Sequence, residues 1–232
     1  MSPPEQQPFG FRIEDQGGFD TFVDAGNELT VASITRAVES RSHEFFYVFG
    51  PQNSGKTHFL TAVYRRAKQE GLEASYLDLA TIVKVGSEAL YHGSPDLNIL
   101  DSVDLAAGMD AFELGLFSFY NRWLEGGRGV LVASARCSPD RLPFARHDLN
   151  TRMASGVGCP FVPLDEQGCA KALQLKAGKR GFTLTDGVSE FLVSHYNRDM
   201  ANLTGLLDRL DRASLSEKRH ITVRLIKRVL GV

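Results

Sequence analysis

The chain has 232 residues, of which 43% are hydrophobic, and it carries a formal net charge of −2. This length and hydrophobic content are enough for one large folded domain, alone or with a small second one. The lack of a basic excess argues against broad non-specific DNA binding, although a local basic patch is compatible with it. Three cysteines without a C-x-x-C pair, no signal peptide and no membrane-spanning apolar run predict a reduced cytoplasmic protein with no membrane partner.

Residues 1–18 are rich in proline, glutamine and glycine, a composition that predicts a mobile tail. Within the tail, Gln6, Phe9 and Phe11 combine a hydrogen-bonding side chain with two aromatic ones. This is the form of a short peptide ligand whose apolar side chains fill pockets on a partner. A tail that folds back on its own domain is an equally good interpretation of the composition alone.

The segment from Phe19 to Val23 leads into a helical pattern over residues 27–39. Phe22 and Val23 are candidates to wall the base of a nucleotide, because a phosphate-binding motif follows this segment. Ordinary core packing of Phe19 and Phe22 is equally consistent with the sequence. The buried face of the helix is expected to carry Leu29, Ala32, Ile34, Ala37 and Val38.

The most informative motif is GPQNSGKT at residues 50–57, which matches the phosphate-binding pattern G-x-x-x-x-G-K-[ST]. The apolar run FFYVF before it predicts a buried strand, and apolar residues at helical spacing after it predict a helix. Gly50 and Gly55 allow backbone N–H groups to point into one concavity at the positive end of that helix. We expect Lys56 to reach the β- and γ-phosphates and Thr57 to hold Mg²⁺. The predicted nucleotide contacts are Gly50, Pro51, Gln52, Asn53, Ser54, Gly55, Lys56, Thr57 and His58, with Phe22 and Val23.

A second element of this site is the apolar run at residues 97–100, which ends in Asp101. A carboxylate directly after an apolar strand can bind Mg²⁺ beside the loop, directly or through water. Ser102 stands where many ATPases of this kind have a second carboxylate that orients the attacking water. Asp104 lies further on and is expected to belong to a turn or a helix cap.

The remaining pattern changes at residue 165. Before it, further strands are expected at 73–79, 129–134 and 159–164, with an apolar helix at 109–125 that covers the sheet. After it, amphipathic helices are expected at about 165–179, 185–196, 199–214 and 222–230.

Strands alternating with helices, followed by helices alone, predict an α/β fold in which a doubly wound parallel sheet precedes a small helical lid. The predicted division is a tail at 1–18, a nucleotide-binding domain at 19–164 and a lid domain at 165–232.

Together these motifs resemble the AAA+ module of the DnaA-related family, and the resemblance covers nearly the whole chain. The match to the family lies in Phe19–Val23, the loop at 50–57, Ile99–Asp101, Glu125–Gly127 and Thr151–Met153. The match is closer to Hda-type regulators of replication initiation, through the segments at 117–122, 172–177 and 210–214. The sequence ends after the lid, where the DNA-binding helix-turn-helix of DnaA would follow.

The resemblance implies a specific set of partners. Hda-type proteins bind the DNA-loaded sliding clamp, the β subunit of DNA polymerase III, through a Gln-x-x-Leu-x-[Leu/Phe] tail. They carry an ADP-type nucleotide with Mg²⁺ and stimulate DnaA to hydrolyse its own ATP, which prevents re-initiation. Gln6, Phe9 and Phe11 match the tail motif by spacing, with Phe9 in place of the usual leucine. DNA would be contacted only through the clamp, and a homodimer or a higher homo-oligomer is expected.

Arg152 matches the arginine finger of the family. An arginine presented to a neighbour's nucleotide stabilises charge on the transferring phosphoryl group, a contribution of about 10³–10⁵ in rate. The pocket served in trans would be that of DnaA. The alternative for Arg152 is a surface ion pair, which contributes little.

Three departures from the family pattern affect catalysis. Ser102 replaces the second acid, Ala135 stands where DnaA has an aspartate that senses the γ-phosphate, and Ala201 stands where the family has its lid arginine. These losses weaken ATP-specific chemistry more than diphosphate binding, so we predict little or no hydrolysis by the protein itself. Arg198 is a candidate to replace the missing lid arginine.

Two other functions remain compatible with the sequence. One is a self-sufficient AAA+ ATPase of the DnaA or helicase-loader type, which the intact phosphate loop supports. The other is a DNA-targeting adaptor that places other proteins at particular sites.

Overall fold

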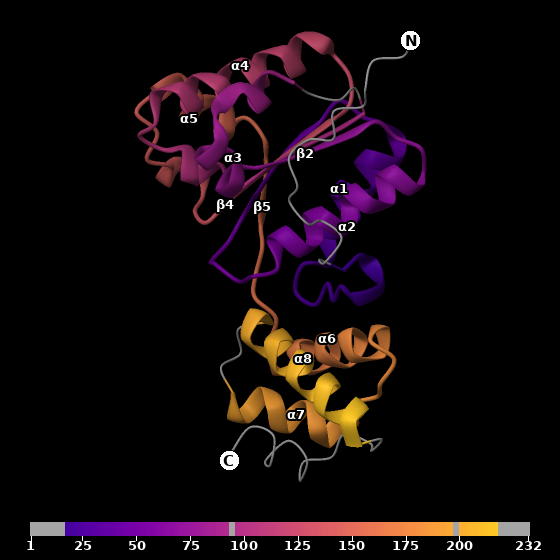
Figure 1. The fold of residues 1–232 in the computed structure, drawn as a ribbon. Coiled ribbons are helices and arrows are strands. Elements are labelled where there is room, and N and C mark those ends of the chain that lie inside the picture. The colour runs from indigo at the N-terminus through magenta and orange to yellow at the C-terminus, as the bar shows by residue number, and fades with distance from the viewer. Residues whose placement is uncertain (1–16, 93–95, 197–199, 218–232) are drawn as a thin grey trace, which may run out of the picture.

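The computed structural model describes residues 17–92, 96–196 and 200–217. A parallel sheet with helices on both faces is followed by three further helices, as Figure 1 shows. The sheet has five strands in the order β2-β3-β4-β1-β5, and all of its pairs are parallel. The strands are β1 (Phe45–Phe49), β2 (Ala74–Asp78), β3 (Leu97–Asp101), β4 (Val130–Ala135) and β5 (Val157–Pro160).

Helices cover both faces because the central strands are mostly apolar; every residue of β3 and β4 is buried. Within β1, successive side chains enter opposite layers, so Phe46 and Val48 pack on one side while Phe45 and Tyr47 pack on the other. The first layer contains α1 (Glu28–Ser40) and α2 (Lys56–Gln69).

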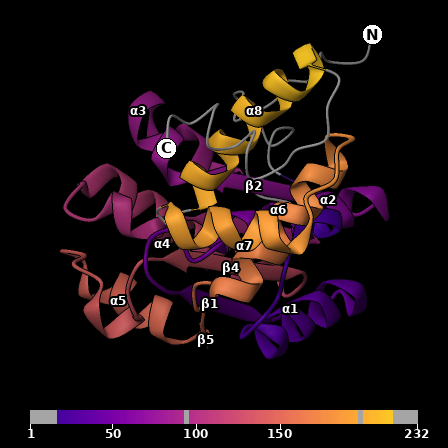
Figure 2. The same cartoon turned by 90° about the horizontal axis from the view of Figure 1, so that it is seen from below.

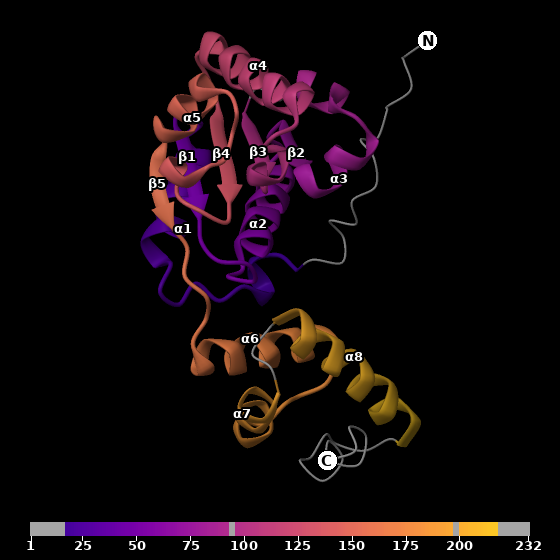
Figure 3. The ribbon, with the colours of Figure 1, turned by 90° about the vertical axis from the view of Figure 1, so that its left-hand side faces the viewer.

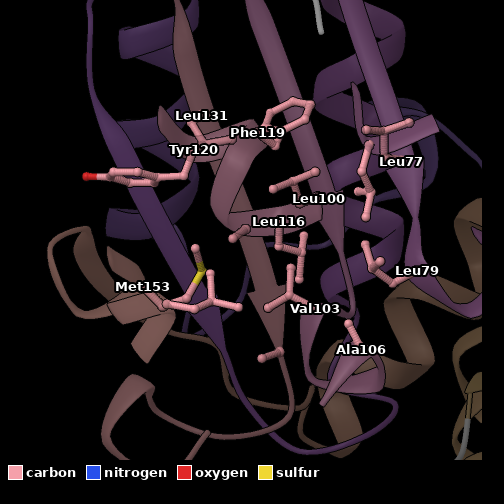
Figure 4. Packing of buried hydrophobic residues seen from close by; sticks show 14 of the residues in the cluster. Leu77, Leu79, Leu100, Val103, Ala106, Leu116, Phe119, Tyr120, Leu131 and Met153 are labelled. Carbon is pink, nitrogen blue, oxygen red and sulfur yellow. The ribbon is translucent and has the colours of Figure 1, made fainter. Parts of the chain in front are cut away.

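The second layer contains α3 (Leu79–Val85), α4 (Asp110–Gly126) and α5 (His147–Ala154). Figure 4 shows part of its core, where Leu116 and Phe119 of α4 lie close to Leu100 and Leu131 of the sheet. The described residues also form the short 3₁₀ helices η2 (Phe19–Thr21), η3 (Ser87–Tyr91), η4 (Val103–Ala106) and η5 (Pro139–Arg141).

The last three helices, α6 (Glu166–Lys179), α7 (Asp186–His195) and α8 (Met200–Glu217), form a separate apolar cluster. The Asp165 carboxylate caps α6 by accepting a hydrogen bond from the N–H of Gly168 at 2.7 Å. Figure 3 shows the arrowheads of β4 and β5 pointing toward these helices, and Figure 2 views the molecule from their side. The helical lid therefore faces the carboxyl ends of the strands, and the predicted fold class is confirmed.

Three sequence predictions about elements were wrong. The second strand ends at Asp78 rather than at 79, because the Asp78 carboxylate accepts from the N–H of Ala80 and the hydroxyl of Thr81, which starts α3. The last strand is Val157–Pro160 rather than 159–164, because its pairing with β1 ends there and the chain then leaves for the lid.

The third error concerns α1, whose expected buried face was too wide. Leu29 is 86% exposed and Ala32 is also exposed, whereas Ile34, Ala37 and Val38 are buried as predicted. The helix predicted at 222–230 lies outside the described residues. Within the part of the chain that is described, no helix is both long and apolar enough to span a membrane.

A buried carboxylate joins α4 to the start of α5. Glu113 has an exposed fraction of 0% and accepts three backbone hydrogen bonds, from Gly108 (2.7 Å), Ala145 (3.0 Å) and Arg146 (2.9 Å). An ion pair between Asp110 and Arg146, at 2.7 Å, lies beside it. The first turn of α4 thus fixes the segment that leads into α5.

We predict that Glu113→Gln lowers the free energy of unfolding by about 2 kcal/mol, because an amide N–H would replace the oxygen that accepts from Arg146. Chemical denaturation measures this loss. Glu125→Gln, an exposed position on the same helix, is the matched control and should change stability by less than about 0.5 kcal/mol. Equal losses in the two variants would contradict the structural role of Glu113.

Candidate nucleotide-binding site

The phosphate-loop sequence connects the carboxyl end of β1 to α2. Gly50 is required by a close backbone approach, since a Cβ there would lie 2.0 Å from the carbonyl oxygen of Phe161. Gly55 and Asn53 have positive φ angles of 93° and 62°, which turn the loop back toward the helix. The loop is therefore shaped by one backbone contact and two left-handed residues.

Lys56 is the first residue of α2, and its side chain reaches back across the loop. Its Nζ donates to the carbonyl oxygens of Gly50 and Pro51, both at 2.8 Å, and to the hydroxyl of Ser54 at 3.1 Å. Burial lowers the pKa of Lys56, and the negative charges of Asp101 and Asp104 oppose this shift. All three ammonium protons thus have partners inside the loop, where a phosphate oxygen can exchange for one of them.

Asp101 is the last residue of β3 and has an exposed fraction of only 2%. Its Oδ1 accepts from the hydroxyl of Ser134, and its Oδ2 accepts from the hydroxyl of Tyr76 at 2.8 Å. These two contacts hold the carboxylate in one orientation. Neither partner was predicted from the sequence, although Ser134 is a hydroxyl within an otherwise apolar strand, which is a usable signal.

The predicted Mg²⁺ ligands, Thr57 and Asp101, can be tested by their chemistry. No group of three or more His, Cys, Asp or Glu side chains in the described ranges could hold a metal alone. Mg²⁺ in phosphate-loop sites takes one or two protein oxygens and completes its shell with phosphate and water. One hydroxyl and one fixed carboxylate fit that requirement.

The positions of the missing catalytic groups are also informative. Ser102 takes a left-handed conformation at the start of η4, so Ser102 rather than Asp104 occupies the N-cap position. Asp104 lies within η4 and accepts from Nε of Arg136 at 2.6 Å. Ala135 is buried at the end of β4. Asp104, the next acid along the chain, is therefore paired with an arginine. Ala201 lies on α8, and Arg198 lies outside the described residues.

A pocket of about 430 Å³ lies between the loop and the lid. Phe22, Val23, Asn53, Ser54, Gly55 and His58, which are among the predicted nucleotide contacts, line it from the sheet-containing part. The pocket lining does not include Gly50, Pro51, Gln52, Lys56 and Thr57, which belong to the loop and the first turn of α2. Leu164 lines it just before the lid, and the lid contributes Cys169, Ala172, Lys176, Met200, Thr204, Gly205 and Asp208.

Aromatic packing divides the roles of the two phenylalanines near the pocket. Phe22 lines the pocket and packs edge-on against His58, with ring centroids 5.5 Å apart. Phe19 packs against Phe22 and Phe59 and does not line the pocket. Burial lowers the pKa of His58 to about 4, so its ring is neutral at pH 7 beside the hydroxyl of Thr21.

Asn27 fixes the connection from the sheet to the lid. Its side chain is buried and brackets Val162, accepting from the Val162 N–H at 2.8 Å and donating to the Val162 carbonyl oxygen at 3.0 Å. The same residue precedes α1, just after Phe22 and Val23. One side chain thus ties the lid connection to the segment that walls the pocket.

Arg152 lies on α5, away from the pocket. Its guanidinium carbon is 5.4 Å from the ring centroid of Tyr120 and 5.9 Å from that of Phe117, both on α4. Among the described residues it forms no ion pair, and it does not line the pocket. Figures 1 and 3 show α5 beside α4 and separated from the lid. The surface ion-pair alternative is not what this part of the structure shows.

The predicted peptide ligand in the tail, formed by Gln6, Phe9 and Phe11, lies outside the described residues. Its role as a ligand therefore stays a prediction.

Comparison with known proteins identifies relatives of both parts of the chain. A family model described as "Hda, lid domain" matches residues 165–230. An uncharacterized protein of Haemophilus influenzae is 31% identical over 229 residues, which cover 98% of this chain and 99% of that protein.

Two solved structures from DnaA are similar over most of the chain. Domain III of the Thermotoga maritima replication initiation protein DnaA has a TM-score of 0.77 and 19% identity, covering 92% of this chain and 95% of that chain. AMPPCP-bound DnaA from Aquifex aeolicus has a TM-score of 0.64 and 22% identity, covering 84% of this chain and 64% of that chain.

The structural matches show the fold of the sheet-containing part and its lid, and the lid match adds a sequence signature. The chain therefore belongs to the Hda-like, DnaA-related family of AAA+ proteins.

Proposed function

We propose that this protein is a nucleotide-binding adaptor that docks on the DNA-loaded sliding clamp and stimulates DnaA to hydrolyse its ATP, so that replication does not re-initiate. The observation that carries the proposal is the position of Arg152. Its guanidinium is held on two aromatic rings, without a carboxylate partner among the described residues, and outside the protein's own pocket. Such an arginine is available to a nucleotide bound by another molecule.

The support for Arg152 is geometric and electrostatic. Cation–π contacts with Tyr120 and Phe117 restrain the guanidinium without neutralising its charge. Tyr120 also contacts Ser155 at 2.8 Å between hydroxyl oxygens, and the Ser155 hydroxyl donates to the Arg152 carbonyl oxygen at 2.7 Å. These contacts fix both the backbone and the side chain, which is the preorganisation that an arginine finger needs.

The protein's own pocket has the groups that bind a nucleotide but lacks one that hydrolysis needs. Lys56 and the loop remain available for phosphates, and Thr57 with Asp101 would hold Mg²⁺ and so orient the β-phosphate. The second acid is absent at Ser102, and Asp104 is bound to Arg136. We propose an ADP-type nucleotide with Mg²⁺ and little or no hydrolysis. The AMPPCP-bound DnaA of Aquifex aeolicus, which has the same fold, supports nucleotide binding, and the absent second acid supports the diphosphate.

The remaining partners follow from the same assignment. Residues 1–18 would bind the β subunit of DNA polymerase III through Gln6, Phe9 and Phe11, and DNA would be reached only through that clamp. Residues 19–164 would bind the nucleotide, and residues 165–232 would form the lid. Self-association into a homodimer or a higher homo-oligomer is part of the proposal.

The second candidate is a self-sufficient AAA+ ATPase, favoured by the intact loop and by the fixed Asp101 carboxylate. The missing second acid at Ser102 opposes it. A DNA-targeting adaptor has no specific observation in its favour within the described structure.

We predict that Arg152→Ala lowers the stimulation of DnaA by at least about 100-fold, because the transition-state charge loses its cation. The assay is single-turnover hydrolysis of labelled ATP prebound to DnaA, with DNA-loaded clamp present. Gln6→Ala should also lose stimulation, and excess clamp should partly restore it only in that variant. Arg128→Ala, an exposed arginine outside this cluster, is the control and should keep full activity. Full activity of Arg152→Ala would refute the finger assignment.

We predict that Lys56→Ala weakens ADP binding at least about 100-fold, because the ammonium that reaches the phosphates is removed. Titration calorimetry of the purified protein with ADP and Mg²⁺ gives the affinity. Lys68→Ala, an exposed lysine on the same helix, serves as the comparison and should bind ADP as the wild type does. Unchanged affinity in Lys56→Ala would mean that the loop does not hold the phosphates.

A further inference from the structure

Lys176 is a cation of the lid that no predicted role accounts for. It lies on α6, is partly buried and lines the pocket opposite Asn53, Ser54 and Gly55. The side chain therefore faces the same space as the phosphate loop, but from the lid.

The carboxylates closest to Lys176 are bound to other cations. Asp20 forms an ion pair with Lys179 at 2.8 Å, and Asp208 forms one with Arg180 at 2.7 Å. Lys176 itself makes no ion pair with any residue that the structure describes. It thus lies near two formed ion pairs, and none of the described carboxylates pairs with it.

An ammonium group in this setting is stabilised by an anionic ligand. Burial is the main factor that lowers the pKa of Lys176, and the charges of Arg180 and Lys179 add to it. Removing an unpaired charge from water costs free energy, and an incoming anion offsets that cost. The phosphates are the anionic part of a nucleotide, so they are the natural partner.

The position of Lys176 relative to α2 supports the same ligand. His58 follows Thr57 in the first turn of α2 and lines the same pocket as Lys176. Lys176 therefore faces the pocket that the amino end of α2 also lines. This is the end at which a helix after a phosphate loop meets its anion.

We propose that Lys176 binds a phosphate oxygen of the carried nucleotide and so supplies, from α6, the lid cation that is missing at Ala201 on α8. The proposal rests on the proposed function, in that the pocket carries a nucleoside diphosphate. Through this contact the nucleotide would be bound to the lid. Lys176 lies one helical turn before Lys179, whose ion pair with Asp20 already joins α6 to η2.

The test compares Lys176→Met with Lys171→Met, an exposed lysine on the same helix. Affinity for ADP is measured by calorimetry, and affinity for inorganic pyrophosphate is measured by competition against ADP, both on the full chain. We expect Lys176→Met to weaken both ligands at least about tenfold, as for a lost charge-assisted hydrogen bond. Lys171→Met should bind both normally, and Lys176→Arg should retain most of the affinity.

Stability separates a ligand contact from a structural role. The thermal midpoint of nucleotide-free Lys176→Met should equal or exceed that of the wild type, because an unpaired cation is removed. Two outcomes overturn the proposal alone: normal ADP affinity, or weaker ADP with unchanged pyrophosphate binding, which would place Lys176 on the base or sugar. If Arg198→Ala rather than Lys176→Met loses pyrophosphate, the lid cation is Arg198. If the wild type binds no ADP, the proposed nucleotide carriage fails, and this assignment fails with it.

Discussion

The contact between Gly50 and the backbone of Phe161 determines both halves of the candidate site. A Cβ at residue 50 would lie 2.0 Å from the Phe161 carbonyl oxygen, and the Phe161 N–H donates to the Phe49 carbonyl oxygen at 2.7 Å. The phosphate loop and the exit toward the lid are thus set by the same few atoms. Asn27 extends this arrangement by holding Val162, the next residue, with two hydrogen bonds. The residues that follow the edge strand β5 therefore shape the pocket.

The distribution of charge separates binding from hydrolysis. Near the loop, the Lys56 ammonium donates within the loop, and the Tyr76 hydroxyl holds the Asp101 carboxylate in place. The next acid along the chain, Asp104, is bound to Arg136. Arg152 has no carboxylate partner among the described residues, and its guanidinium lies over two aromatic rings of α4, away from the pocket. Glu113, also on α4, accepts hydrogen bonds from the backbone just before α5 and so fixes where α5 begins. These placements suit a protein that carries one nucleotide and acts on another.

The sequence predicted the parts of the fold that depend on local pattern. The loop, its strand and its helix follow from glycine spacing and hydrophobic periodicity, and the change to helices alone marks the lid. Periodicity could not place Leu29 and Ala32, because a helix at an edge of the molecule buries only part of its apolar stripe. It also could not find Tyr76, Ser134 or Lys176, since their positions depend on strand pairing and on how the lid meets the loop.

The most direct test of the account asks whose nucleotide is hydrolysed. ATP labelled with one isotope would be prebound to DnaA, and ATP with a second isotope to this protein, before the two are mixed with DNA-loaded clamp in a single turnover. The account predicts rapid loss of the γ-phosphate from the DnaA-bound label, while the label on this protein stays intact. Hydrolysis of this protein's own label, with that of DnaA unchanged, would contradict the account and identify a self-sufficient ATPase.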